Sequence, residues 1–168
     1  MTAGSVSPSP VLVLGLGNLL LQDDGTGIEL LRRIESSAPP GDRVEFIDGG
    51  TQGLNLLGLL ENRKLVVVLD AVQLGSDAGT IHVIRGPEIT KLRAQRSTTA
   101  HEGNALELLT VSRILGAEPD EVLVIGIEPL HFGTGIGLSE PVTAALSRAE
   151  AIIRLAIDSA GGFKARCV

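Results

Sequence analysis

Two carboxylates and one imidazole lie where apolar runs of the sequence give way to polar loops. Asp24 is the second acid of a pair flanked by glycines, Asp70 ends the apolar run 65–69, and His101 follows the polar stretch 96–100. Oxygen, oxygen and nitrogen donors suit a zinc- or nickel-like ion and leave coordination positions open for water or substrate. The three residues do not form a compact motif, so their positions in the fold carry the metal-site hypothesis.

Each of the three also has a purely structural interpretation. An acid such as Asp24 before a helix is typical of an N-cap, and Asp70 after a strand is typical of a turn. A lone histidine such as His101 is common in solvated loops. For Asp70 we favour function, because the last residue of a central strand faces the crevice where α/β proteins bind ligands. His131 is a rival ligand in a loop near the same predicted edge, whereas His82 lies within a predicted edge strand.

Hydrophobic patterning predicts the elements that must position these side chains. Short runs rich in Val, Ile and Leu predict five strands, at residues 11–15, 44–48, 65–70, 80–85 and 122–127. Apolar residues at helical spacing predict helices over about residues 25–38, 54–62, 102–115 and 139–159. The last helix has a predicted buried stripe of Val142, Ala145, Leu146, Ala149, Ile152, Ile153 and Ala156. Residues 86–100 are polar and predict a loop.

The alternation of strands and helices predicts the fold class. We expect an α/β protein, a three-layer α/β/α sandwich around a five-stranded, mostly parallel twisted sheet. The strand at 80–85 follows the strand at 65–70 too closely for a crossover helix, so it is expected to be the one antiparallel strand, at an edge. Ligands of such sheets bind beyond the carboxyl ends of the strands.

The chain length of 168 residues predicts one domain. We place a single α/β domain at residues 11–160, after a disordered lead-in over 1–10 that is rich in Ser and Pro, and before a flexible tail over 161–168. The first residues have neither the basic start nor the apolar region of a signal peptide. With Cys167 as its single cysteine, the chain has no intramolecular disulfide, and we expect a cytoplasmic monomer.

Charge and composition argue against two classes of partner. The net charge is −6 without a basic run, which disfavours nucleic acid and anionic membranes. The three aromatic residues are Phe46, Phe132 and Phe163, too few to stack bases. A strand followed by Gly15-Leu16-Gly17 suggests a dinucleotide site, but the third glycine of that fingerprint is missing. The helix is also expected to begin only near residue 25, beyond two acids that repel phosphate.

Five segments together resemble the maturation proteases of NiFe hydrogenases. The resemblance covers about residues 11–155, and its most specific part is the first segment, a strand followed by a glycine-asparagine turn and an acidic pair. The segments, in chain order, are GLGNLLLQDDGTG (15–27), IDGGTQG (47–53), VVVLDAV (66–72), TTAHEGNALELL (98–109) and VLVIGIEP (122–129).

The resemblance implies site residues as well as an activity. The metal-binding residues of the family carry over to Asp24, Asp70 and His101, and Asp48 with its following glycines matches another recurring family segment. Such a protein is an aspartyl-type or metal-dependent endopeptidase that removes the C-terminal extension of the hydrogenase large-subunit precursor once that precursor holds nickel. Asp23 is then a speculative candidate to orient a ligand or act as a base.

The resemblance leaves two roles open for the three residues. They are either a receptor for nickel presented by the precursor, which we favour because cleavage then waits for nickel, or ligands of a metal that acts as a Lewis acid. A zinc-like ion suits the same donors. The competing classes are a metal-dependent binding module or chaperone that docks on the precursor without cutting it and, with less support, a nucleotide-binding protein.

Overall fold

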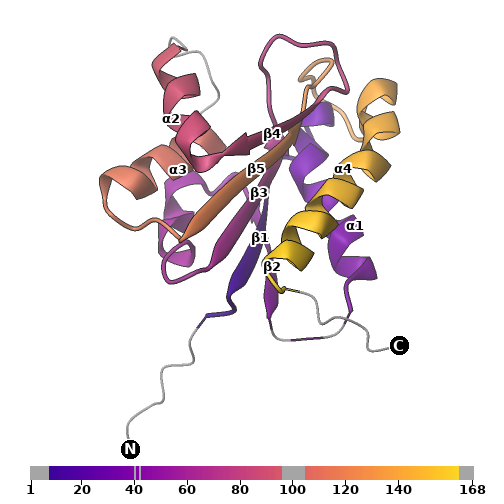
Figure 1. Cartoon of the computed structure of the whole chain (residues 1–168). Coiled ribbons are helices and arrows are strands. Elements are labelled where there is room, and N and C mark those ends of the chain that lie inside the picture. The colour runs from indigo at the N-terminus through magenta and orange to yellow at the C-terminus, as the bar shows by residue number, and fades with distance from the viewer. Residues whose placement is uncertain (1–7, 40, 42, 96–104, 163–168) are drawn as a thin grey trace, which may run out of the picture.

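The computed structural model describes residues 8–39, 41, 43–95 and 105–162. They form a twisted five-stranded sheet with helices on both faces, which confirms the predicted three-layer α/β/α sandwich (Figure 1). The strand order is β2-β1-β3-β5-β4. The strands are β1 (Val11–Leu16), β2 (Val44–Gly50), β3 (Leu65–Ala71), β4 (Ile81–Arg85) and β5 (Glu121–Ile127).

The direction of each strand follows from its connection. β1 pairs in parallel with β2 and β3, and β3 pairs in parallel with β5, each connection carrying helical turns over one face. β4 is the antiparallel edge strand, as predicted from its short connection to β3. Its partner is β5 and not its sequence neighbour β3, because the third strand is already paired on both sides.

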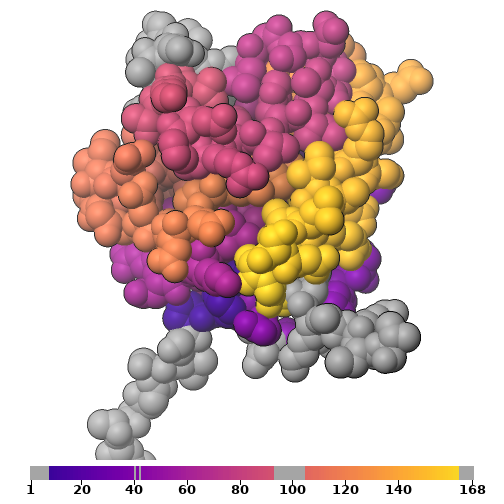
Figure 2. Space-filling model, viewed as in Figure 1, coloured from indigo at the N-terminus to yellow at the C-terminus, as the bar shows by residue number. Residues whose placement is uncertain are grey.

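The alternation of side chains along the central strands builds two separate cores. Val11 and Val13 of β1 pack with helices α1 (Thr26–Ser37) and α4 (Glu140–Ser159), while Leu12 and Leu14 face the opposite layer. That opposite layer contains the 3₁₀ segment η2 (Gly53–Leu59) and helices α2 (Gly86–Gln95) and α3 (Ala105–Ile114). In the space-filling view α4 (yellow) covers one side of the molecule, and α2 and α3 cover the other (Figure 2).

The predicted stripe of α4 is confirmed, with Ile152 and Ala156 only partly buried at its margin. Ile157 extends the stripe by one further turn and is fully buried. This helix therefore buries one face along its whole length, as the helical spacing of its aliphatic residues requires.

The prediction of a polar loop over 86–100 is wrong for its first ten residues, which form α2. Glu88 accepts a hydrogen bond from the amide of Arg85 at 2.8 Å and so closes the turn that starts the helix. Ile89 is buried in the core between the sheet and the layer of η2, α2 and α3. Leu92, about one helical turn later, packs against the same core. Two apolar residues at this spacing are too weak a periodic signal to distinguish a short surface helix from a loop.

The predicted lead-in over 1–10 also needs correction at its end. The carbonyl of Ser9 accepts a hydrogen bond of 2.8 Å from the Arg63 side chain, and that of Pro10 accepts bonds from the amides of the two residues after Arg63. Ser9 and Pro10 are therefore bound to the domain, while residues 1–7 lie outside the described chain.

A similar correction applies to the predicted tail over 161–168. Gly162 is buried, and its amide donates to the carbonyl of Ile157 at 2.8 Å, which closes the end of α4. The domain therefore includes Gly162, and the residues after it lie outside the described part.

A close contact between α1 and the sheet positions the loop that precedes this helix. A Cβ atom at Gly27 would lie 2.3 Å from the carbonyl oxygen of Leu16 and 2.2 Å from that of Leu69. Only glycine allows the first turn of α1 to rest directly on the carboxyl ends of β1 and β3. The acidic pair, which comes immediately before α1, is therefore held at this edge of the sheet. Among the residues that the structure describes, no helix has the length and apolar composition needed to cross a membrane.

Candidate functional site

Asp70 lies at the carboxyl end of the central strand β3, with only 5% of its surface exposed. Its carboxylate accepts hydrogen bonds from the amides of Ala71 at 2.8 Å and Ala105 at 3.0 Å. Burial raises the pKa of this carboxyl to about 7, the bonding amides oppose the rise, and the negative charge of Asp24 adds to it. Asp70 therefore combines the turn-like role of the structural interpretation with the buried, strand-end position expected of a ligand.

Asp24 lies in a short 3₁₀ turn, η1 (Gln22–Gly25), between β1 and α1. The chain leaves β1 through Gly17, whose φ is +128° and where a Cβ atom would come within 1.9 Å of the Asp24 carbonyl oxygen. The N-cap of α1 is Gly25, so Asp24 is not the helix cap that its sequence position suggested. Asp24 is half-buried, and its charge acts on Asp70, which places two of the three predicted site residues at one edge of the sheet.

His101, the third predicted residue, lies outside the described part of the chain. Within the described ranges, no three His, Cys, Asp or Glu side chains form a group suited to a metal ion. The nearest described point in the sequence is Ala105, four residues later, and its amide is bonded directly to Asp70. The carboxylate pair is thus part of the described site, and the proposed nitrogen ligand stays a prediction.

Asp23 has a role that differs from that of its neighbour. It is fully buried and accepts bonds from the amide and hydroxyl of Ser139, at 2.7 and 2.8 Å, and from the amides of Leu130 and His131, at 2.9 and 3.4 Å. Burial alone would raise the pKa of the carboxyl, but the bonds from Ser139, Leu130 and His131 outweigh it and hold this pKa below its usual value. Both oxygens are occupied, so Asp23 anchors the loop after β5 and is not the base that we considered.

Glu128 is a second buried anchor, and sequence reasoning missed it. It follows β5 directly, is 2% exposed, and accepts bonds from the amides of Leu74 and Gly75 and from Nε2 of His82 at 2.7 Å. Burial by itself would raise the pKa of Glu128. The bonds from the two amides and from His82 outweigh that effect and hold the pKa below its ordinary value. The same strand-end position that pointed to Asp70 was a signal for Glu128. His82 is thereby a structural partner in the edge strand.

The loops after β1 and β5 are joined by their backbones. The amide of Gly135 donates to the carbonyl of Leu20 at 2.9 Å, and that of Gln22 donates to the carbonyl of Gly135 at 3.0 Å. Gln22 has a φ of +49°, a left-handed conformation immediately before the acidic pair. His131 is exposed on the loop after β5, and its described contact is the amide bond to Asp23.

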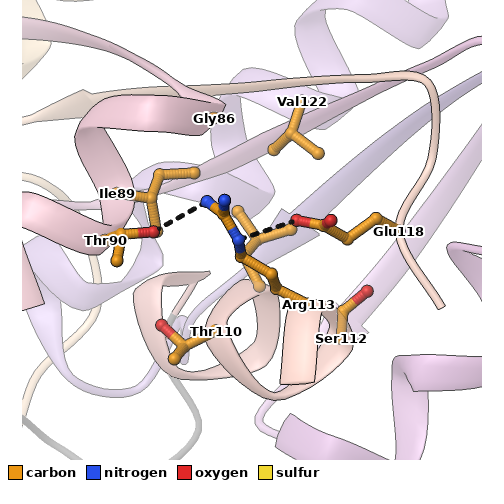
Figure 3. Close-up of a pocket in the computed structure, with 9 residues that line it drawn as sticks. Gly86, Ile89, Thr90, Thr110, Ser112, Arg113, Glu118 and Val122 are labelled. Atoms are coloured by element: carbon orange, nitrogen blue, oxygen red, sulfur yellow. Dashed lines mark hydrogen bonds and ion pairs between the residues drawn. The ribbon is translucent and has the colours of Figure 1, made fainter. Parts of the chain in front are cut away.

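A pocket between α2 and α3 lies away from the carboxylates (Figure 3). Val122, at the amino end of β5, is one of its lining residues, whereas Asp70 pairs with residue 126 near the carboxyl end of the same strand. Arg113 spans the pocket, with a bond of 2.9 Å to Thr90 and an ion pair of 3.8 Å to Glu118. The Arg113 guanidinium is therefore engaged with two residues that line the pocket, and the pocket lies toward the amino end of β5, away from the two carboxylates.

The fold of the chain is that of a class of endopeptidases. The chain superposes on the hydrogenase-maturating endopeptidase HybD of Escherichia coli with a TM-score of 0.80 and 30% sequence identity, over 90% of this chain and 93% of that one. It also matches the maturation protease HycI of Thermococcus kodakarensis with a TM-score of 0.71, where 20% identity supports the fold alone.

Sequence comparison assigns the family. The model of the hydrogenase maturation proteases matches residues 28–155, and the chain belongs to this family. Among curated relatives, the hydrogenase 2 maturation protease of Escherichia coli K12 is 31% identical over 152 residues, which are 90% of this chain and 92% of the relative. The hydrogenase expression/formation protein HupM of Azotobacter chroococcum is 34% identical over 143 residues, 84% of this chain and 68% of the relative. The predicted membership of this family is thereby confirmed.

Proposed function

We propose that this endopeptidase removes the C-terminal extension of a NiFe hydrogenase large-subunit precursor, and that Asp24, Asp70 and His101 recognise nickel presented by that precursor. The observation that carries the proposal is the pair of carboxylates at the sheet edge, one of them buried and directly bonded to the start of α3. Family membership supplies the reaction class, and the carboxylate pair supplies the reason for a metal requirement.

A divalent cation resolves an electrostatic conflict at this edge. The burial of Asp70 and the charge of Asp24 both disfavour the ionised form of Asp70, so the two carboxylates resist carrying two negative charges together. A cation between two carboxylates reverses that preference, because its attraction for both outweighs their mutual repulsion. Carboxylate and imidazole donors suit nickel, and they suit zinc-like ions as well.

His101 is the proposed nitrogen donor. Its distance from the carboxylates is bounded by the chain, because Ala105 is bonded to Asp70 and four extended residues span at most about 14 Å. We propose that the side chain of His101, which precedes this anchor point, completes a three-ligand set with Asp24 and Asp70. Three protein ligands leave further positions for groups of the precursor, as a guest metal requires.

The receptor role links nickel loading to cleavage. When the precursor holds nickel, its metal docks on the three side chains and brings the scissile peptide bond to the sheet edge. Water then adds to the carbonyl carbon, the carbon–nitrogen bond breaks, and the released amine takes the proton. Without nickel the precursor lacks this contact, so the cut waits for metal insertion. We also propose that the protein acts as a cytoplasmic monomer, without nucleic acid or membrane.

The deciding experiment combines the purified protein with nickel-loaded and nickel-free precursor and measures the product masses. We expect a shortened large subunit and a released peptide in the nickel-loaded sample alone. A stable complex that forms without any mass change would show a docking module in place of a protease. Equal cleavage of both precursors would refute nickel recognition while leaving the peptidase activity intact.

A further inference from the structure

Exposed aliphatic side chains gather at the edge of the sheet that carries the carboxylates. In the described part of the chain eight large apolar side chains are exposed, and four of them belong to segments that follow β1, β2 and β5. Three of these four, Leu20 at 62%, Leu130 at 56% and Ile136 at 87% exposed, belong to the two loops that are joined by their backbones. Half of the exposed large apolar side chains in the described part of the chain therefore belong to segments at the edge that carries the proposed site.

We call these two loop segments, residues 18–22 and 129–137, the apolar ribbon. Leu20 and Ile136 are brought together because Leu20 and Gln22 both bond to Gly135, the neighbour of Ile136. Leu130 is attached to the same unit through its amide bond to Asp23. The loop after β5 rises at the upper right of the molecule, beside the start of α4 (Figure 2).

The ribbon is firmly held, and it carries no formal charge. Neither segment contains Lys, Arg, Asp or Glu, although these residues make up 20% of the chain, and His131 is its one titratable side chain. The Asp23 carboxylate accepts bonds from the ribbon amides of Leu130 and His131, and from the amide and hydroxyl of Ser139, two residues beyond the ribbon. Gly137, with a φ of +98°, ends the segment directly after Ile136. A rigid surface that exposes aliphatic side chains beside a site is typical of an interaction surface.

We infer that the apolar ribbon binds an uncharged, aliphatic stretch of the precursor polypeptide next to the scissile bond. The inference rests on the proposed function, and the partner follows from position. Leu20 lies four residues before Asp24, and Asp23, which anchors the ribbon, is adjacent to Asp24. A polypeptide held at Asp24 and Asp70 therefore passes beside the ribbon. A charged segment would find no opposite charge there, whereas aliphatic side chains would bury apolar surface against Leu20, Leu130 and Ile136.

The test is a double variant, Leu130→Ser with Ile136→Ser, compared with the wild type in cleavage of nickel-loaded precursor. We expect KM to rise about tenfold with kcat within about twofold, because the lost contacts bind substrate and transition state alike. Binding of the precursor, measured by calorimetry, should weaken by the same factor. The matched control is Ile114→Ser with Leu155→Ser, which removes two side chains of similar exposure, 76% and 67%, from α3 and α4. All variants should melt as the wild type does, since exposed side chains contribute little stability.

An unchanged KM and an unchanged affinity in the ribbon variant would overturn the inference, as would an equal loss in the helix control. Light scattering tests whether a second copy of this chain occupies the ribbon. A wild-type dimer that the ribbon variant converts to a monomer would assign the surface to that second copy and overturn the inference. Failure of the wild type to cleave refutes the proposed function, and the calorimetric comparison then still decides whether the ribbon binds the precursor.

Discussion

Replacement of Asp23 by Asn should destabilise the fold more than its conservative chemistry suggests. The carboxylate accepts three short bonds, of 2.7, 2.8 and 2.9 Å, and Asn turns one of its two oxygens into a donor that faces other donors. A hydrogen bond to a charged group contributes about 1.5–3 kcal/mol, and a buried donor left unpaired costs about 1–3 kcal/mol. The relief of burying a charge offsets part of this loss, which leaves a net cost of about 2–3 kcal/mol.

For a chain of this length, each kcal/mol lowers Tm by about 2–4 °C, so Asp23→Asn should melt roughly 5–10 °C below the wild type. The matched control is Asp48→Asn. Asp48 is exposed and accepts one bond, from the amide of Gly50 at 3.0 Å, which Asn can also accept, so its Tm should change by less than about 2 °C. Asp23→Asn should also raise KM, since the apolar ribbon loses its anchor. A wild-type Tm for Asp23→Asn, or an equal shift for Asp48→Asn, would refute the anchor role.

Three further predictions concern the proposed site and the second buried anchor. Asp70→Asn and His101→Ala should each slow processing of nickel-loaded precursor by at least about tenfold, the scale of effect seen when metal binding is weakened. Asp120→Asn, which changes an exposed carboxylate at the amino end of β5, should cleave normally in the same mass assay. A chelator that strips nickel from the precursor should stop cleavage yet leave the Tm of the isolated protein unchanged, because the metal arrives with the substrate; a lower Tm would indicate a resident ion. Because the folded-state pKa of Glu128 lies below its ordinary 4.5, its stabilisation is present above that pH and lost as pH falls through the folded pKa, so Glu128→Gln should flatten the acid side of the stability curve measured by urea midpoints. Parallel curves for wild type and Glu128→Gln would show that this carboxylate contributes nothing to acid sensitivity.

The sequence alone determined the architecture and the position of Asp70. Continuous aliphatic runs define strands buried on both faces, and a connection too short for a helix requires the antiparallel edge strand, because both effects depend on local composition and chain length. The last residue of a central strand necessarily lies at the carboxyl edge of the sheet. Helix α2 was not predicted, because its local hydrophobic pattern is weak. Its burial depends on contacts with core residues that are far away in the sequence.

Only the tertiary structure distinguished Asp23 from Asp24. The two acids have the same charge and nearly the same sequence surroundings, but Asp23 turns inward because Leu130 and Ser139, more than a hundred residues later, supply amides for it. The pairing of Glu128 with His82 and the exposure of Ile136 depend likewise on how segments far apart in the sequence meet. A buried carboxylate needs hydrogen-bond donors, and the fold brings those donors from distant parts of the chain. Whether an aliphatic side chain is buried or exposed is likewise decided by the fold and not by the adjacent residues.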